Sequence, residues 1–256
     1  MAGGGPAGME AARVASLRGH NVLLYEKESE LGGQLLLASI PPHKEEIENV
    51  AGYLKTQLEK LRVKIVLGEE VSQGIIDEIR PDAVIIATGA VPAVPPIPGI
   101  KRNNVFIARE VLLGKAVAEP KDVIVIGGGM VGVETAEFLA EIGKEVTIIE
   151  MLERVAEDLG PVARMFQKKR LAQKGVKILT GTKVKEIKEN GVMAQRGGES
   201  IFVPAGSIVI AVGATPDRKL AALLADNIPA YIVGDSAEAG DIMNGIHDGS
   251  LIARKL

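Results

Sequence analysis

The sequence contains no cysteine and no tryptophan, and only 3% of its residues are aromatic. The absence of cysteine excludes disulfides, thiol redox catalysis, cysteine-ligated zinc and a cysteine-ligated iron–sulfur cluster within these residues. No apolar run approaches the roughly 18 residues that a membrane helix needs. The first residues lack the basic head and apolar middle of a signal peptide. We therefore expect a cytoplasmic protein without a membrane partner.

An excess of positive charge is also missing, since 30 Lys and Arg face 33 Asp and Glu. This balance argues against a nucleic-acid partner. His20, His43 and His247 stand apart from one another, so no metal site is expected. The sequence indicates no pair of a nucleophile and a general base, so no side chain is assigned as catalytic.

Glycine is abundant, 30 of 256 residues, and much of it belongs to an internal repeat. Shifted by 124 positions, the two halves align without a gap across some 90 residues. Such a register predicts two related structural units. The matching pairs include Gly3 and Gly127, Gly5 and Gly129, Gly8 and Gly132, Glu26 and Glu150, Ala87 and Ala211, and Gly89 and Gly213.

Each half begins as a strand–helix–strand unit. In the second half, residues 123–126 predict a buried strand, 133–142 a helix closed by Gly143, and 146–149 a second strand. The first half predicts a helix over about 8–18 and a strand over 22–25. Met165 and Phe166 are expected in the core.

The proline-rich segment 91–99 predicts a linker, and 214–217 a return crossing. The fold class is therefore α/β, with two Rossmann-like dinucleotide-binding domains, the second inserted in the first. The first domain comprises residues 1–92 plus 217–256, and the second comprises 93–216. Counterparts of residues 121–124 are missing at the start of the first domain. We hypothesise a truncated gene product whose first domain is weakened and holds little FAD.

Each glycine-rich turn has the spacing GxGxxG, and an acid follows 18 residues after its last glycine. The glycines permit a tight turn, close approach to a pyrophosphate and close helix packing, while the acid can hold a ribose hydroxyl. Two such sites in one chain predict a pair of redox dinucleotides, most simply a flavin and a nicotinamide.

The chain resembles the flavoproteins with two dinucleotide-binding domains, which include glutathione reductase and thioredoxin reductase. It is more similar to the C-terminal half of the 2,4-dienoyl-CoA reductase, 2-enoate reductase and trimethylamine dehydrogenase family. The segments that carry this closer similarity are Tyr25-Glu-Lys27, Glu30-Leu-Gly-Gly-Gln34, Ala38-Ser-Ile-Pro-Pro-His-Lys-Glu45 and Gly245-Ile-His-Asp-Gly249.

The resemblance implies cofactor roles at matching positions. The FAD side comprises Gly3, Gly5, Pro6, Ala7, Gly8, Glu26, Lys27, Gly32, Gly33, Gln34, Ala87, Thr88, Gly89, Gly234 and Asp235. Within that set, Glu26 is expected on the adenosine ribose and Asp235 on the flavin ribityl chain. The nicotinamide side comprises Gly127, Gly129, Met130, Val131, Gly132, Glu150 and Gly213.

Glu150 favours NADH over NADPH, because a carboxylate accepts ribose hydroxyls and repels a 2′-phosphate. The predicted reaction is hydride transfer from NADH to FAD and onward to an acceptor. The family resemblance implies a barrel domain, or a separate protein, that carries FMN and an iron–sulfur cluster. Two alternatives stay open: a non-catalytic module that binds ADP or a partner, and a freestanding diaphorase.

Overall fold

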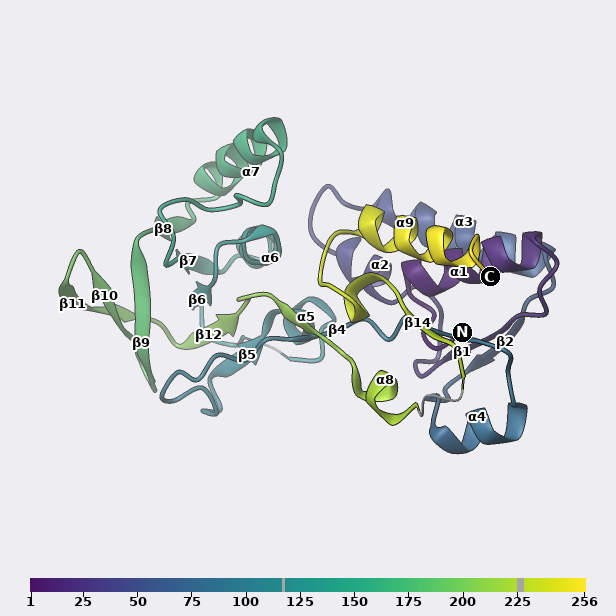
Figure 1. The fold of residues 1–256 in the computed structure, drawn as a ribbon. Coiled ribbons are helices and arrows are strands. Elements are labelled where there is room, and N and C mark those ends of the chain that lie inside the picture. Colours follow the sequence, from purple (N-terminus) through teal and green to yellow (C-terminus); the bar gives the residue numbers. More distant parts are fainter. Residues whose placement is uncertain (117, 225–227) are drawn as a thin grey trace. The chain divides into compact units, whose positions relative to one another are not determined.

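In the computed structural model, which describes residues 1–116, 118–224 and 228–256, the chain divides into two compact units. Unit 1 comprises Met1–Ser39, Lys44–Val91 and Ala214–Leu256, and unit 2 comprises Ile40–His43 and Pro92–Gly213. The colours of Figure 1 follow the chain through both units. Within the described residues, no helix is both long enough and apolar enough to cross a lipid bilayer.

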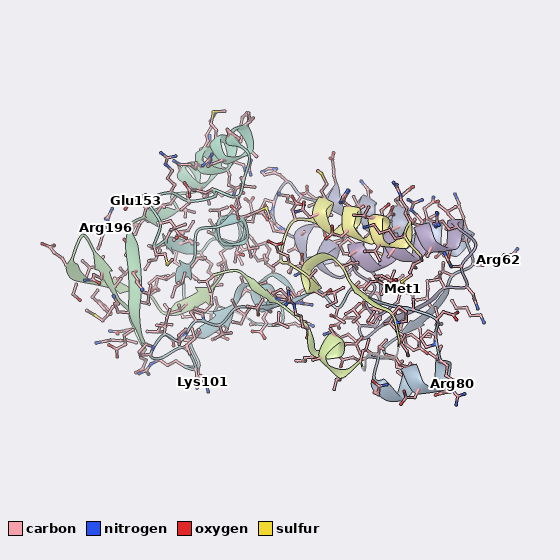
Figure 2. All side chains as sticks on the ribbon, viewed as in Figure 1. Met1, Arg62, Arg80, Lys101, Glu153 and Arg196 are labelled. Carbon is pink, nitrogen blue, oxygen red and sulfur yellow. The ribbon has the colours of Figure 1, made fainter. Side chains whose placement is uncertain are left out.

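Unit 2 is built on a parallel five-stranded sheet in the order β5-β12-β6-β7-β8. An antiparallel sheet in the order β11-β10-β9 forms the green hairpin region of Figure 1, with Arg196 labelled in Figure 2 at the end of β10. The elements of unit 2 are β5 (Val105–Ile107), α5 (Ala108–Leu112), β6 (Asp122–Ile126), α6 (Met130–Glu141), β7 (Glu145–Ile149), α7 (Pro161–Gln173), β8 (Lys177–Leu179), β9 (Thr182–Lys188), β10 (Gly191–Arg196), β11 (Glu199–Pro204) and β12 (Ser207–Ile210).

Strand β6 shows why the five-stranded sheet is buried on both faces. Successive side chains of a strand point to opposite faces. Val123 and Val125 pack with residues of α5, α6 and α7. Ile124 and Ile126 pack with residues of β9 and β10. The short apolar run therefore forms a central strand, covered by helices on one face and by the antiparallel sheet on the other.

Helix α7 corrects one expectation from the sequence. Met165 is 59% exposed and Phe166 50% exposed, whereas Gln167 and Leu171 are buried. Residues three or four apart share one face of a helix. Gln167 donates a hydrogen bond to Glu137 of α6 at 2.8 Å, which turns that face inward. The prediction that Met165 and Phe166 belong to the core is wrong.

Unit 1 contains two parallel strand pairs, β1 with β2 and β3 with β14, and β4 pairs with β13. Residues of α1, α2, α3 and α9 form one core cluster, and residues of α4 and α8 contribute to a second. Helices α1, α3 and α9 lie together in Figure 1. The elements of unit 1 are α1 (Pro6–Leu17), β1 (Leu23–Glu26), α2 (Gln34–Ala38), α3 (Ile47–Lys60), β2 (Lys64–Leu67), α4 (Gln73–Ile79), β3 (Val84–Ile86), β4 (Ala90–Pro92), β13 (Ala214–Pro216), α8 (Lys219–Leu223), β14 (Ala230–Ile232), the 3₁₀ helix η1 (Gly234–Ser236) and α9 (Ile242–Ala253).

A single residue, Ala2, links the two strand pairs of unit 1. It forms isolated bridges to Tyr25 of β1 and Ile86 of β3. By the 124-residue offset, Ala2 stands where unit 2 has the end of β6, which pairs with β7 along its whole length. Each large apolar side chain of such a strand stabilises a fold by roughly 1.5–3 kcal/mol when buried. At this position unit 1 buries the Ala2 methyl group, and the partly buried Met1 packs against the core cluster of α1, α2, α3 and α9.

Candidate functional site

In unit 1, the chain leaves Ala2 through three consecutive glycines that lead into α1. Gly3 has a φ of +108°, and a Cβ added there would lie 2.2 Å from the Ala87 carbonyl oxygen. A Cβ on Gly8, in the first turn of α1, would lie 1.9 Å from the Gly3 carbonyl oxygen. Both positions therefore accept only glycine, because backbone atoms already occupy the space.

Gly5 differs from these two glycines. Its φ of −75° is open to every residue, and an added Cβ would meet nothing within 4 Å. Neither the backbone conformation nor packing within the chain requires glycine at this position. The close approach of a ligand to the backbone would require it. Pro6 has no N–H, and the N–H groups of Ala7 and Gly8 have no acceptor within the helix. This positive end of α1 suits a phosphate.

The Glu26 carboxylate holds the glycine turn from the end of β1. Its Oε2 accepts the Gly4 N–H at 2.6 Å, and its Oε1 accepts the Glu28 N–H at 2.8 Å. The sequence analysis did not assign Gly4, although a Cβ there would lie 2.4 Å from the Leu31 Cδ2. The signal that could have found it is the unbroken run of three glycines in both halves.

The loop after β1 folds back onto the same turn. Gly32 donates its N–H to the Gly4 carbonyl at 2.9 Å. A Cβ on Gly33 would lie 2.9 Å from the Gly5 Cα, and Gln34 begins α2. Lys27 is exposed. The predicted residues 32–34 are therefore brought to the glycine turn.

Two distant segments of unit 1 reach the start of α1. Ala87 contacts Gly3, as described above, and Thr88 follows with its hydroxyl donating to the Asp217 carbonyl at 2.8 Å. The Gly89 carbonyl accepts the Asp217 N–H at 2.9 Å. In η1, a Cβ on Gly234 would lie 2.8 Å from the Ala7 Cβ. The fold thus gathers residues that the sequence separates by more than 200 positions.

Asp235 follows Gly234 and is partly buried. Burial raises the pKa of its carboxyl, Asp241 raises it further, and a hydrogen bond from the Gly240 N–H at 3.1 Å offsets part of the effect. Ser236, which sequence reasoning missed, is fully buried, with its hydroxyl 2.9 Å from the Ile86 carbonyl. This contact fixes η1 to β3, and nothing in the sequence marks the serine.

Unit 2 repeats the backbone geometry of the first turn. Gly127 has a φ of +104°, and an added Cβ would lie 2.3 Å from the Ala211 carbonyl oxygen. A Cβ on Gly132 would lie 2.0 Å from the Gly127 carbonyl oxygen. Val131 is exposed beside Gly132, and Gly213 has a φ of +99° with open space around it.

Glu150 of unit 2 accepts the same pattern of backbone hydrogen bonds as Glu26 of unit 1. Glu150 Oε2 accepts the Gly128 N–H at 2.5 Å, and Oε1 accepts the Leu152 N–H at 2.8 Å. Ala156 donates its N–H to the Gly128 carbonyl at 2.7 Å, as Gly32 does to Gly4 in unit 1. The two turns and their following loops therefore share one hydrogen-bond pattern.

One side chain breaks this symmetry. Gly129, with a φ of −68°, has a close neighbour where Gly5 has none, because an added Cβ would lie 3.2 Å from Asp158 Oδ2. The same oxygen accepts the Met130 N–H at 2.7 Å. Sequence reasoning missed Asp158, because a single aspartate in a loop carries no spacing signal.

Comparison with known proteins assigns the chain to a family of oxidoreductases. Residues 2–236 match the family described as pyridine nucleotide-disulphide oxidoreductase. The chain is 42% identical over 256 residues to bilirubin reductase of Mediterraneibacter gnavus, covering 99% of this chain and 40% of that protein. It is 39% identical over 259 residues to NADH oxidase of Thermoanaerobacter brockii, again covering 99% and 40%.

Solved structures agree with this result. A complex of 2-naphthoyl-CoA reductase superposes with a TM-score of 0.95 at 33% identity, covering 99% of this chain and 39% of that one. Thioredoxin reductase of Lactococcus lactis has a TM-score of 0.76 at 24% identity, covering 99% and 95%. The predicted fold class, with two Rossmann-like domains, is confirmed. The chain spans about two-fifths of the length of the curated relatives named above.

Proposed function

Because the chain belongs to the pyridine nucleotide-disulphide oxidoreductase family, we propose that it oxidises NADH with FAD held in unit 1 and NADH held in unit 2. At the coarser level, it is an NAD(P)H- and FAD-dependent oxidoreductase module related to larger multidomain reductases. The bound cofactors supply the hydride chemistry, in which two electrons and a proton pass from the nicotinamide to the flavin. The chain supplies their binding and orientation.

The single observation that carries the proposal is the open face of Gly5 at the start of α1. A Cβ on Gly3, Gly4 or Gly8 would clash with atoms of the chain itself, whereas a Cβ on Gly5 would not. Glycine at position 5 therefore suits a ligand that approaches the Gly5 Cα. The N–H groups of Ala7 and Gly8 are available to the phosphates of FAD. Glu26 retains lone pairs for ribose hydroxyls while it holds Gly4, since each carboxylate oxygen accepts more than one hydrogen bond.

The flavin end of the cofactor is assigned to η1. Asp235 would accept a hydrogen bond from a hydroxyl of the ribityl chain. The preceding residue, Gly234, lies next to Ala7 at the start of α1. The loop at 32–34 would cover the nucleotide, because Gly32 and Gly33 lie on the glycine turn. Residues 87–89 would form the opposite wall.

In unit 2, Glu150 occupies the position of Glu26 and favours a ribose with a free 2′-hydroxyl. Met151 and Leu152, which follow it, are exposed apolar residues that offer no charge to a 2′-phosphate. Arg154 is also exposed but lies four positions beyond the acid. We therefore assign NADH, and not NADPH, as the electron donor. The name of the relative from Thermoanaerobacter brockii agrees with this choice.

The electrons must leave the flavin for an acceptor, and the chain has no cysteine to form a disulfide or a cluster. The matched reductases are about two and a half times as long as the region they share with this chain. We propose that the acceptor lies on another domain or a separate protein, such as a barrel that carries FMN and an iron–sulfur cluster.

The test is reconstitution of the full chain with FAD and anaerobic titration with NADH. We expect bound FAD, bleaching of its visible band by NADH, and slower bleaching by NADPH. Glu26→Gln should lose FAD, because the amide NH₂ would face a backbone N–H. Glu150→Gln should keep FAD but require roughly tenfold more NADH, a loss of ~1.4 kcal/mol.

Three outcomes would oppose the proposal. A clear preference for NADPH would contradict the choice of donor. Binding of ADP without FAD would favour the non-catalytic module. Loss of FAD in Glu150→Gln, with FAD retained in Glu26→Gln, would reverse the assignment of the two units.

A further inference from the structure

The carboxylate of Asp158 lies over the glycine turn of unit 2. Its Oδ2 accepts the N–H of Met130, the first residue of α6, at 2.7 Å. It is also the nearest atom to the open side of Gly129. The loop that carries Asp158 follows β7 and passes Glu153, which is labelled in Figure 2. A negative group therefore rests where the fingerprint glycine leaves room for a phosphate.

In unit 1, a Cβ added at the equivalent Gly5 would have none of the described residues within 4 Å. By the 124-residue offset, Asp158 corresponds to Gln34 and Met130 corresponds to Pro6, which has no N–H to donate. The loops themselves follow the same path, because Gly32 and Ala156 bond to equivalent carbonyls. The two units thus differ at this point in their side chains and not in the course of the backbone.

A carboxylate and a pyrophosphate both favour the positive end of a helix, and two anions at one helix end repel each other. We propose that Asp158 determines the affinity of unit 2 for its dinucleotide. The carboxylate holds the phosphate position in the free protein and leaves it when the nucleotide binds. This inference rests on the proposed function, since it takes unit 2 as the nicotinamide site.

The structure allows the carboxylate to leave. Asp158 is exposed and accepts one hydrogen bond from α6. The loop itself need not move: Ala156, two residues earlier, is buried in the core of unit 2 and its N–H stays bound to the Gly128 carbonyl. Rotation of the exposed Asp158 side chain, at the cost of the hydrogen bond from Met130, is enough to free the phosphate position.

The consequence suits the different tasks of the two units. A nicotinamide nucleotide must be released after each turnover, whereas FAD stays bound. Competition from Asp158 weakens the binding in unit 2, and the neutral Gln34 leaves unit 1 without such a competitor. Asp158 therefore makes one of two similar sites an exchangeable one.

The experiment compares Asp158→Asn with Glu157→Gln in the full chain saturated with FAD. Glu157→Gln is the matched control, because Glu157 is exposed and the substitution removes the same charge one residue away. Calorimetric titration with NAD⁺, which binds without reducing the flavin, gives the dissociation constants. We expect threefold to tenfold tighter binding in Asp158→Asn and less than a twofold change in Glu157→Gln.

The melting temperature without nucleotide provides a second readout. Asp158→Asn should lower it slightly, because the helix loses a charged cap, while the affinity rises. Asp158→Ser keeps a neutral helix cap and should show the same tighter binding of NAD⁺. It keeps the test valid if Asp158→Asn fails to fold. The inference fails if the wild type binds NAD⁺ and both Asp158→Asn and Asp158→Ser bind it with equal or lower affinity. Asp158 would then be only a helix cap. If the wild type and all variants bind no NAD⁺, the proposed function itself fails.

Discussion

Asp235 carries a charge that costs the folded chain stability before a cofactor binds. Because burial raises the pKa of its carboxyl above the usual value near 3.9, the unfolded chain ionises first as the pH rises. The folded state therefore loses stability through that interval, and the deficit stays constant above the raised pKa. Asp235→Asn should raise the melting temperature by roughly 1–2 °C at pH 7, and the gain should vanish as the pH falls below about 4.

The same substitution should weaken FAD binding, because an amide is a poorer acceptor for a ribityl hydroxyl than a carboxylate is. Stability and function thus oppose each other at this residue, as is common at binding sites. Thermal melts across pH, with and without FAD, check both effects. A variant that is less stable at every pH would show that Asp235 is a structural residue, held by the Gly240 N–H.

At the scale of elements, α7 is attached to α6 through a buried acid. Glu137 is 1% exposed, and its carboxylate accepts hydrogen bonds from Arg170 at 2.7 Å and Gln167 at 2.8 Å. Glu137→Ala would leave both donors without this acceptor. We expect a loss of about 2 kcal/mol, below the usual cost of breaking a fully buried pair because Arg170 keeps some contact with water. The melting temperature of unit 2 should fall by several degrees.

Glu141 offers the matched control on the same helix. It pairs with Lys174, which follows α7, but the Glu141 side chain is 53% exposed, whereas that of Glu137 is buried. Surface ion pairs contribute little because water screens them. Glu141→Ala should therefore leave the melting temperature almost unchanged. Equal effects of the two substitutions would mean that the pairing of charges, and not burial, joins the helices.

The same elements show what the sequence could and could not predict. The strand of β6 and the helix of α6 were predicted because an apolar run and a glycine turn are local signals, and the resemblance to enoate-type reductases is confirmed by the relatives. The inward face of α7 could not be predicted, because Gln167 is buried by an acid on another helix. Gly128 donates its N–H to the Glu150 carboxylate, and the Asp158 carboxylate accepts the Met130 N–H, so both act on partners more than 20 positions away. The cofactor-binding residues stay predictions.

At the scale of the whole molecule, the two units have separate cores and should melt separately. Among the described residues, the core clusters of unit 1 and unit 2 have no member in common, so each unit should give its own transition. A ligand at about 100 times its dissociation constant stabilises the unit that binds it by about 2.7 kcal/mol, which is roughly 10 °C for a unit of this size. FAD should therefore raise only the transition of unit 1 in a calorimetric scan, and NAD⁺ only the transition of unit 2.

Glu137→Ala supplies the internal marker for this scan, because it lowers the transition of unit 2 whatever ligand is present. If FAD shifts the transition that Glu137→Ala lowers, the flavin has been assigned to the wrong unit. If one transition responds to both ligands and to the substitution, the two units unfold together. Two transitions, each moved by its own ligand, would instead show that the 124-residue repeat consists of two units that fold and bind their ligands independently.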